Sequence, residues 1–237
     1  MSSPLKVFIT GASSGIGLAL AAEYARRGAI LGLVARRGDA LAAFQQSHPQ
    51  NSISTYSVDV RDCEALAEAA AQFIAQHGLP DILIANAGIS RGAVTGHGDL
   101  RTFREVMDIN YFGMVATFEP FAAAMVAAKK GTLVGIASIA GVRGLPGSGA
   151  YSASKSAALK YLEALRVEMR PLGVGVVTIA PGYIRTPMTE HNPYGMPFLM
   201  DADRFAVKVA GAVALVWNGL AHGSLRWMAL TSTMRVV

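Results

Sequence analysis

A tyrosine and a lysine, four residues apart, stand at the head of a segment that is expected to be helical. The stretch GAYSASKSAALKYLEALRVEM, residues 149–169, carries apolar side chains at helical spacing, and the same spacing continues back to Lys155 and Tyr151. A buried ammonium is costly unless acceptors hold it, and a cation beside a phenol favours the phenolate. The pattern therefore predicts that Lys155 lowers the pKa of Tyr151 and makes it an acid and base usable near neutral pH.

Two more polar residues stand where apolar ones are expected. Ser138 ends the apolar run TLVGIA, so its hydroxyl would lie at the carboxyl edge of a sheet, where it can donate to a carbonyl oxygen. Asn110 interrupts the apolar stripe of a helix expected over residues 100–128. Because a buried amide needs partners, Asn110 either bonds to local backbone or holds a water or a ligand. Each residue alone has an ordinary structural explanation, but their convergence at one edge indicates catalysis.

A glycine-rich turn, TGASSGIG, follows the first apolar run and precedes the helix-forming stretch LALAAEYARR. A helix that begins at such a turn offers free backbone N–H groups and the positive end of its dipole to a pyrophosphate, and glycines let the phosphates approach. The spacing of Gly11, Gly15 and Gly17 is not G-x-G-x-x-G. The turn is therefore either a phosphate site or a tight connection between strand and helix.

The elements that must position these residues follow from an alternation of short apolar runs with longer Ala-rich helical patterns. Because the runs are apolar throughout rather than at every second residue, they indicate a parallel sheet covered by helices on both faces. The sequence therefore predicts an α/β fold with a doubly wound, Rossmann-like sheet, whose ligand crevice lies at the carboxyl ends of the strands. The strands are expected near residues 5–10, 29–34, 53–58, 81–85, 131–137 and 174–180.

Composition narrows the class of protein. A chain of 237 residues with 52% hydrophobic content suits a single domain over residues 1–237. The start MSSPLKVFIT lacks a secretory pattern and no run reaches about 18 apolar residues, so we expect a cytoplasmic protein without a membrane span. The net charge of +5 is scattered, which argues against nucleic-acid binding. The lone Cys63 indicates neither a disulfide framework nor a metal site, and we expect no bound metal.

Taken together, these motifs resemble those of the short-chain dehydrogenase/reductase family in its compact single-domain form. They occur in the family's order and spacing over about the first 190 residues. They are TGASSGIG, Asp59, ANAG at residues 85–88, Asn110, Ser138, YSASK at residues 151–155 and PGYIRT at residues 181–186.

The resemblance implies a nicotinamide-dependent oxidoreductase that interconverts an alcohol and a carbonyl. Tyr151 would transfer the proton to or from the substrate oxygen, and Ser138 would hold or polarise that oxygen. Lys155 would bond the nicotinamide ribose and depress the pKa of Tyr151. Asn110 would hold a water that connects Lys155 to solvent as a proton relay.

The resemblance also implies a cofactor site along the strand ends. The glycines would approach the pyrophosphate, Asp59 would accept from the adenine amino group, and Asn86 would brace the fourth strand against the adenosine. Ile184 and Thr186 would anchor the carboxamide. The full set is Thr10, Gly11, Ser13, Ser14, Gly15, Ile16, Gly17, Arg36, Arg37, Asp59, Val60, Asn86, Ala87, Gly88, Tyr151, Lys155, Pro181, Gly182, Ile184 and Thr186.

The segment LVARRGDAL after the second strand predicts NADP(H) in preference to NAD(H). An NAD-preferring site places an acid at the strand end, where it binds the ribose hydroxyls and repels a phosphate. Here that position is Ala35, followed by Arg36 and Arg37. A guanidinium offers a planar fork of donors to a phosphate. Arg36 is the first candidate, with Arg37 on the adenine face or in solvent.

A substrate lid is expected over residues 187–200, in the stretch PMTEHNPYGMPFLM, where Pro, Gly and Asn interrupt any regular period. Its side chains favour an apolar alcohol or carbonyl, and steroid, lipid, aromatic and xenobiotic compounds all stay open. The apolar members of the lid are Met188, Tyr194, Met196, Phe198, Leu199 and Met200.

The segment over residues 201–237 departs from the family, since SLRWMALTSTMRVV lacks the Asp-Gly-Gly turn that usually precedes a seventh strand. A family-type tetramer is therefore in doubt, and a homodimer through the helices at 100–128 and 150–170 is favoured. Other readings are a non-catalytic dinucleotide-sensing regulator or scaffold and a sugar-nucleotide epimerase, for which the chain has no room. The apolar stretches AVKVAGAVALVW and LRWMAL would be either an ordinary core helix and strand or a membrane or partner contact.

Overall fold

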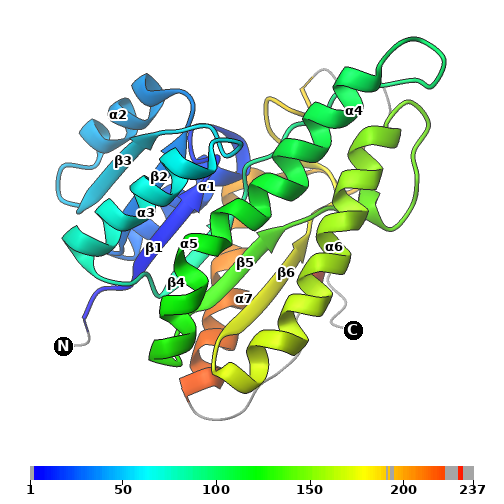
Figure 1. Cartoon of the computed structure of the whole chain (residues 1–237). Coiled ribbons are helices and arrows are strands. Elements are labelled where there is room, and N and C mark those ends of the chain that lie inside the picture. Colours follow the sequence, from blue (N-terminus) through cyan, green and yellow to red (C-terminus); the bar gives the residue numbers. More distant parts are fainter. Residues whose placement is uncertain (1–2, 191, 193–194, 222–228, 232–237) are drawn as a thin grey trace.

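The computed structural model describes residues 3–190, 192, 195–221 and 229–231. Within them, seven parallel strands form one sheet in the order β3-β2-β1-β4-β5-β6-β9 (Figure 1). The direction of winding reverses between β1 and β4, which opens a crevice at the carboxyl ends of these strands. The strands are β1 (Lys6–Thr10), β2 (Ile30–Ala35), β3 (Ile53–Ser57), β4 (Ile82–Ala85), β5 (Thr132–Ile136), β6 (Gly175–Ala180) and β9 (Ala229–Thr231).

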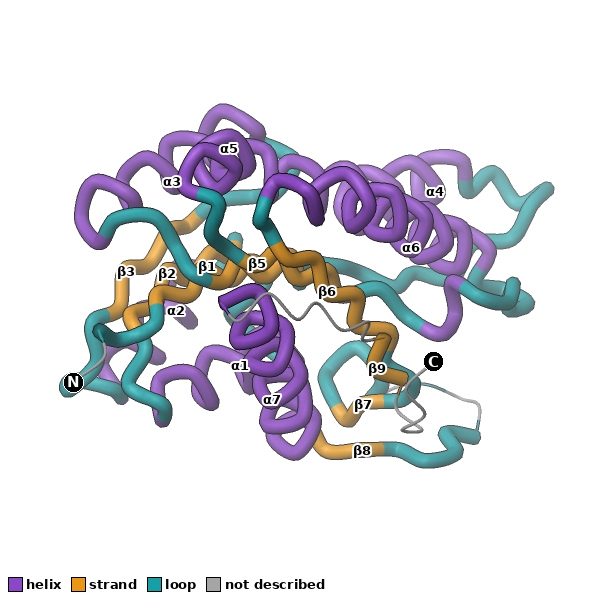
Figure 2. The backbone as a smooth tube through the Cα atoms, turned by 90° about the horizontal axis from the view of Figure 1, so that it is seen from below, coloured by secondary structure: helices purple, strands orange, loops and turns teal. Residues whose placement is uncertain are grey.

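Helices cover both faces of the sheet, as expected for a doubly wound fold (Figure 2). On one face lie α1 (Gly15–Arg26), α2 (Gly38–Ser47) and α7 (Ala202–Ala221). On the other lie α3 (Cys63–His77), α4 (Leu100–Met107), α5 (Gly113–Ala128) and α6 (Gly149–Met169). Strand side chains are buried on both sides, which explains the apolar runs: Ile9 and Leu31 pack with α1 and α7, whereas Phe8 and Leu83 pack with α3 and α5.

The six expected strands are confirmed to within one residue at each end. The seventh strand shows that a family-type closing strand forms here without the Asp-Gly-Gly turn, since Ala229–Thr231 pairs with Thr178–Ala180 of β6. In the stretch AVKVAGAVALVW, Ala206, Val209 and Val213 are fully buried, so it is an ordinary core helix. Residues 225–228 of LRWMAL lie outside the described residues.

The helix expected over residues 100–128 is interrupted. A π-helical turn, η1 (Asp108–Phe112), separates α4 from α5, and Asn110 lies inside it. Such a turn adds a residue to the helical repeat, and π turns often occur at functional sites. The segment Leu100–Ala128 is apolar and long enough to cross a membrane, with a mean hydropathy of 1.3, but Phe118, Phe121 and Met125 pack against the sheet. Its apolar face is therefore part of the core.

A second, small sheet lies beside the crevice, where only loop was expected. Its strands are β7 (Ile184–Arg185) and β8 (Met200–Asp201), which pair in parallel. Met200, the last residue of the predicted lid, therefore lies in the strand β8. The pairing holds the two ends of residues 186–199 together, and Arg185 donates from Nε to Asp201 Oδ1 at 2.9 Å across it.

Candidate active site

Ser138 lies just beyond the end of β5, at the carboxyl edge of the sheet. It begins the short 3-10 helix η2 (Ile139–Gly141), and its Oγ accepts from the N–H of Ala140 at 3.1 Å. The side chain is buried, its hydroxyl donates to the carbonyl of Pro181 at 3.5 Å, and its proximity partly offsets the rise that burial causes in the pKa of Tyr151. Because a hydroxyl has two lone pairs and one proton, Ser138 can bond to the helix and still meet a substrate oxygen beside Tyr151.

Lys155 is buried, with 4% of its surface exposed, although it carries an ionisable amine. Its Nζ donates to the carbonyl of Ile136, the last residue of β5, at 2.8 Å. The same nitrogen lies 5.9 Å from the centre of the Tyr151 ring. Burial lowers the pKa of Lys155 from 10.5 to about 8, because an ammonium is poorly solvated there. The helical spacing thus brings the pair together at the end of β5, as expected.

The direction predicted for the pKa of Tyr151 is wrong in this structure. Burial raises the pKa of the phenol, and the neighbouring Ser138 hydroxyl opposes this increase only in part. The physical reason is that the phenolate loses more solvation on burial than the Ser138 hydroxyl returns. Tyr151 is therefore a protonated phenol at neutral pH, and it is suited to donate a proton.

Asn110 is fully buried, and its amide is bonded to protein groups. Oδ1 accepts from the N–H of Ile89 at 2.8 Å, while Nδ2 donates to the carbonyl of Ile89 and to Ser154 Oγ, both at 2.9 Å. Ser154 in turn donates to the carbonyl of Tyr151 at 2.8 Å. The Asn110 amide is therefore bonded to protein groups that are distant in the sequence, and it ties the loop after β4 to α6. Ser154 was not singled out from the sequence.

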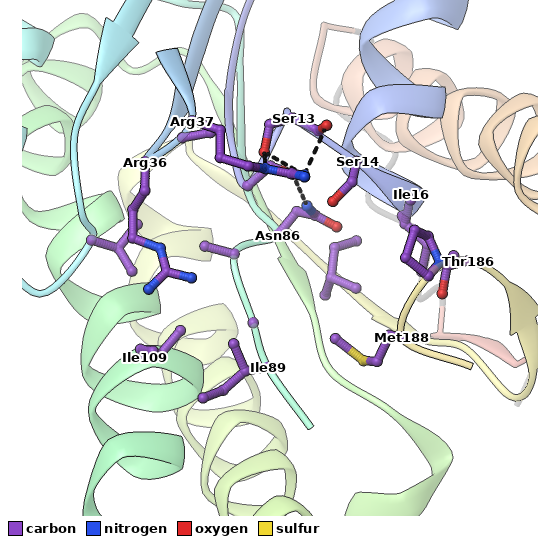
Figure 3. A pocket seen from close by; sticks show the side chains of 18 of the residues that line it. Ser13, Ser14, Ile16, Arg36, Arg37, Asn86, Ile89, Ile109, Thr186 and Met188 are labelled. Atoms are coloured by element: carbon purple, nitrogen blue, oxygen red, sulfur yellow. Dashed lines mark hydrogen bonds between the residues drawn. The ribbon is translucent and has the colours of Figure 1, made fainter. Parts of the chain in front are cut away.

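A cavity of about 350 Å³ opens along the strand ends, and Tyr151 and Lys155 are among the residues that line it. Figure 3 shows the wall of this cavity between Arg36 and Met188. Most of the predicted cofactor residues line it: Gly11, Ser13, Ser14, Gly15, Ile16, Arg36, Arg37, Asp59, Val60, Asn86, Ala87, Gly88, Tyr151, Lys155, Pro181 and Thr186. The sequence reasoning missed several apolar lining residues, which carry no motif: Ala35, Val58, Ile89, Ile109, Ile136, Ala137 and Pro187.

Four predicted cofactor residues are outside the described lining of this cavity, namely Thr10, Gly17, Gly182 and Ile184. Thr10 and Ile184 are buried. The Thr10 hydroxyl accepts from the N–H groups of Asn86 at 3.3 Å and Ala87 at 3.4 Å, so it braces the end of β4. Asn86 returns two bonds from Nδ2, to the carbonyls of Thr10 at 3.0 Å and Gly11 at 3.2 Å. These residues shape the cavity from behind.

The glycine-rich turn has the form of a phosphate cradle. Gly11 and Gly15 have φ angles of +70° and +55°, a region that side chains disfavour. A Cβ on Gly17 would lie 2.2 Å from the carbonyl oxygen of Gly11, so α1 can begin this close to the turn only with glycine there. The N-terminus of α1 faces the cavity without an acidic residue in its first turn. The site therefore fits a dinucleotide pyrophosphate.

Charged residues gather at the end of the cavity near β2 and β3. Arg37 donates from Nη2 to the carbonyl of Ser13 at 3.1 Å and to Ser13 Oγ at 3.2 Å, and Figure 3 shows it beside that residue. Arg36 extends separately, 57% exposed, with Nη1 4.0 Å from Asp59 Oδ2. Asp59 is held by Arg61, another residue that the sequence reasoning missed. This corner is net positive and open to an anion.

The fold and this constellation are those of the short-chain dehydrogenases, and the chain belongs to that family: residues 6–195 match the family described as short chain dehydrogenase. It is an oxidoreductase of the dehydrogenase/reductase type with a nucleotide-binding Rossmann-like fold. Among the described residues, no cluster of His, Cys, Asp and Glu could hold a metal ion.

Particular relatives narrow the comparison. An uncharacterized oxidoreductase of Myxococcus xanthus is 36% identical over 217 residues, which are 91% of this chain and 83% of that protein. Dehydrogenase/reductase SDR family member 7B of Rattus norvegicus is 39% identical over 189 residues, but the chain spans only 58% of its length. An alcohol dehydrogenase from the archaeon Thermococcus sibiricus, solved with 5-hydroxy-NADP, has 25% identity and a TM-score of 0.85, covering 97% of this chain and 96% of that one.

Proposed function

We propose that this enzyme is an NADP(H)-dependent oxidoreductase that transfers hydride between the nicotinamide and a carbonyl or alcohol group of an apolar small molecule. The observation that carries the proposal is the convergence of Ser138 and Lys155 on the Tyr151 side chain, beside a cavity lined by a glycine cradle. A dinucleotide-sensing scaffold would need the cradle but not this buried ammonium, whose desolvation is costly.

The residues divide the chemistry between them. A bound nicotinamide supplies or accepts the hydride. In reduction, the Tyr151 hydroxyl donates its proton to the substrate oxygen, while the Ser138 hydroxyl donates a hydrogen bond that keeps this oxygen in place. Lys155 holds the nicotinamide ribose and carries a proton that can return to Tyr151. Asn110 holds the loop after β4 against α6, and its water-holding role rests on the family resemblance.

The protonated form of Tyr151 favours reduction near neutral pH. A phenol whose pKa lies above its ordinary value is protonated at neutral pH, and the protonated form is the one that donates to a carbonyl oxygen. Oxidation of an alcohol needs the phenolate as a base, so its rate should increase as the pH rises. The direction of the reaction at neutral pH is therefore proposed to be reduction.

The preference for NADP(H) is supported by the two arginines after β2. Arg37 is already anchored on Ser13 at the glycine cradle, and Arg36 is exposed and free to move onto a ribose phosphate. The residue at the end of β2 is Ala35, where an acidic side chain would repel that phosphate. The Thermococcus sibiricus relative was solved with an NADP derivative, which agrees with a phosphate-accepting corner.

Substituting Arg36 by alanine is expected to weaken NADPH binding at least about tenfold and to leave NADH binding within about twofold, since charge-assisted bonds to a phosphate contribute about 1.5–3 kcal/mol. Fluorescence titration of both reduced cofactors measures this. The wild type should bind NADPH at least about tenfold tighter than NADH on the same grounds. Arg170→Ala, which removes an exposed arginine at the opposite edge of the sheet, is the matched control. Equal wild-type affinities for the two cofactors would require the assignment to be withdrawn.

The proposed substrate is apolar because apolar side chains are exposed in the loop after Ser138 and in the segment that includes the cavity residue Met188. Val142 is 71% exposed and Leu145 42% exposed in the loop after Ser138, and Met188 and Phe198 are 49% and 74% exposed in the proposed lid. Exposed apolar groups beside a catalytic cavity are typical of a binding surface for an apolar ligand. Tyr194, another predicted lid residue, lies outside the described residues.

The proposed lid comprises residues 186–199, whose two ends are fixed by the β7–β8 pairing. Few regular backbone hydrogen bonds support the described residues between these ends, so we expect their amides to exchange within seconds to minutes while those of β7 and β8 are protected. Hydrogen exchange with and without NADPH and an inhibitor measures this. Strong protection of the segment in the free protein, unchanged by both ligands, would contradict a closing lid.

Two copies of the chain are proposed to form a homodimer. Exposed apolar groups on the segment over residues 100–128 and on α6, among them Phe112 of η1 at 56% and Val167 of α6 at 72%, support a homodimer through these helices. The sequence-based expectation of a single domain in the cytoplasm stays a prediction. So does the expectation that the protein binds no nucleic acid.

A further inference from the structure

The carboxylate of Asp59, which follows β3, is shared unequally between two arginines. Arg61 donates two parallel hydrogen bonds to it, from Nε to Oδ1 at 3.0 Å and from Nη2 to Oδ2 at 2.6 Å. Asp59 Oδ1 also accepts from the backbone N–H of Arg61 at 3.0 Å. The distance from Oδ2 to Arg36 Nη1 is 4.0 Å, at the limit of an ion pair. A bidentate pair with a backbone bond fixes the carboxylate far more firmly than the loose contact with Arg36.

The contacts of the Asp59 carboxylate matter for cofactor binding because Asp59, like Arg36, lines the cofactor cavity. A carboxylate released from Arg61 would have Arg36 as its nearest cation, and it would repel a phosphate dianion in the same corner. Arg61 is outside the described lining of the cavity, and Asp59 is the lining residue that it bonds. The hydrogen bond from Arg61 is the largest influence that lowers the pKa of Asp59, and the charge of Arg36 is the smallest.

We propose that Arg61 is a positioning residue for cofactor specificity: by holding the Asp59 carboxylate it keeps Arg36 available to the 2′-phosphate of NADP(H). The inference rests on the proposed preference for NADP(H), and it adds a residue that does not touch the cofactor. Asp59 raises the pKa of the Arg61 guanidinium, and the negative charges of Glu105 and Asp108, which also attract it, raise it further.

The test uses two probes that differ by the phosphate alone, 2′,5′-ADP and 5′-AMP, with binding to the whole protein measured by calorimetry. Arg61→Gln is expected to weaken 2′,5′-ADP about three- to tenfold and to change 5′-AMP less than about twofold, in keeping with partly exposed charge pairs. In an Asp59→Asn background the same change should have less than about a twofold effect, because the competing charge is gone. Arg61→Lys, which keeps a cation beside Asp59, should retain most of the discrimination.

Two outcomes would overturn the role of Arg61. An equal loss of both probes in Arg61→Gln would show that the residue only supports the fold near the cavity. A full effect of Arg61→Gln in the Asp59→Asn background would show that Asp59 is not the intermediary. Arg170→Gln controls for removing any exposed arginine. The wild-type ratio of the two affinities tests the cofactor preference, and the change in that ratio on Arg61→Gln tests this inference, so the two can fail separately.

Discussion

Replacing Tyr151 by phenylalanine is expected to lower turnover by about 10²- to 10⁴-fold while leaving NADPH affinity within about twofold, because only the proton donor is lost. The ring stays in place, so the packing beside Lys155 and the walls of the cavity are preserved. Steady-state kinetics on an active carbonyl substrate, together with titration of NADPH, measure both parts of the prediction.

The matched control for this variant is Tyr161→Phe. Tyr161 stands on the same helix and packs against Tyr111 and Phe118, away from the cavity. Its hydroxyl has no role in the proposed chemistry, so turnover should stay within about twofold of the wild type. A Tyr151→Phe enzyme that kept turnover within about tenfold of the wild type would contradict Tyr151 as the general acid.

Replacing Lys155 by methionine is expected to lower turnover by at least about 10²-fold and also to weaken NADPH binding, because the lysine serves both the proton path and the ribose. Methionine has a similar length and needs no solvation, so it fits the buried site. The same kinetic and binding measurements apply. Loss of turnover with unchanged NADPH affinity would show that Lys155 does not hold the cofactor.

The Lys155 variant should also change how stability depends on pH. The folded protein has a lysine pKa of about 8, below the ordinary 10.5, so the unfolded chain binds more protons between these values. The wild type should therefore gain stability as the pH rises from 8 to 10.5 and lose it as the pH falls through 8. At about 1.4 kcal/mol per pH unit the gain is roughly 3 kcal/mol, and Lys155→Met should lack it.

Urea unfolding of both proteins between pH 7 and pH 10.5 measures this difference, and subtracting the two curves removes the titration of other groups. A difference in the free energy of unfolding that stayed constant across this range would show that the amine of Lys155 is solvated. If Lys155→Met is more stable than the wild type at neutral pH, Lys155 is a functional residue that is retained at the expense of stability.

The spacing of Tyr151 and Lys155 was readable from the sequence because helical periodicity is a local property. The strands were readable too, since a central parallel strand must be apolar throughout. The pKa of Tyr151 was not, because its direction depends on how deeply α6 packs against β5, which no local pattern records. The closing strand β9 was open to prediction only as one of two alternatives for LRWMAL. Its three residues pair with a strand about 50 residues earlier in the chain, and they form too short a pattern to indicate a strand alone.

The arrangement of the arginines shows the same limit at the cofactor site. The pair after β2 was visible as charge where an acid was expected, and it was enough to predict NADP(H). Ser13, in the glycine-rich turn, accepts hydrogen bonds from Arg37 and not from Arg36. The sequence alone does not show which of the two guanidinium groups is held in this way. Arg61 was not singled out, because its importance comes from the Asp59 carboxylate that it bonds in two places.

The most direct test of the proposed activity is deuterium transfer from NADPH labelled at the hydride position to a panel of apolar ketones and aldehydes. The wild type is predicted to produce alcohols with deuterium on the carbinol carbon, and Tyr151→Phe is predicted to produce about 10²-fold less or lower still. The panel is run in both the reducing and the oxidising direction. If NADPH binds tightly and no product carries the label, the result would contradict a catalytic role and support a dinucleotide sensor.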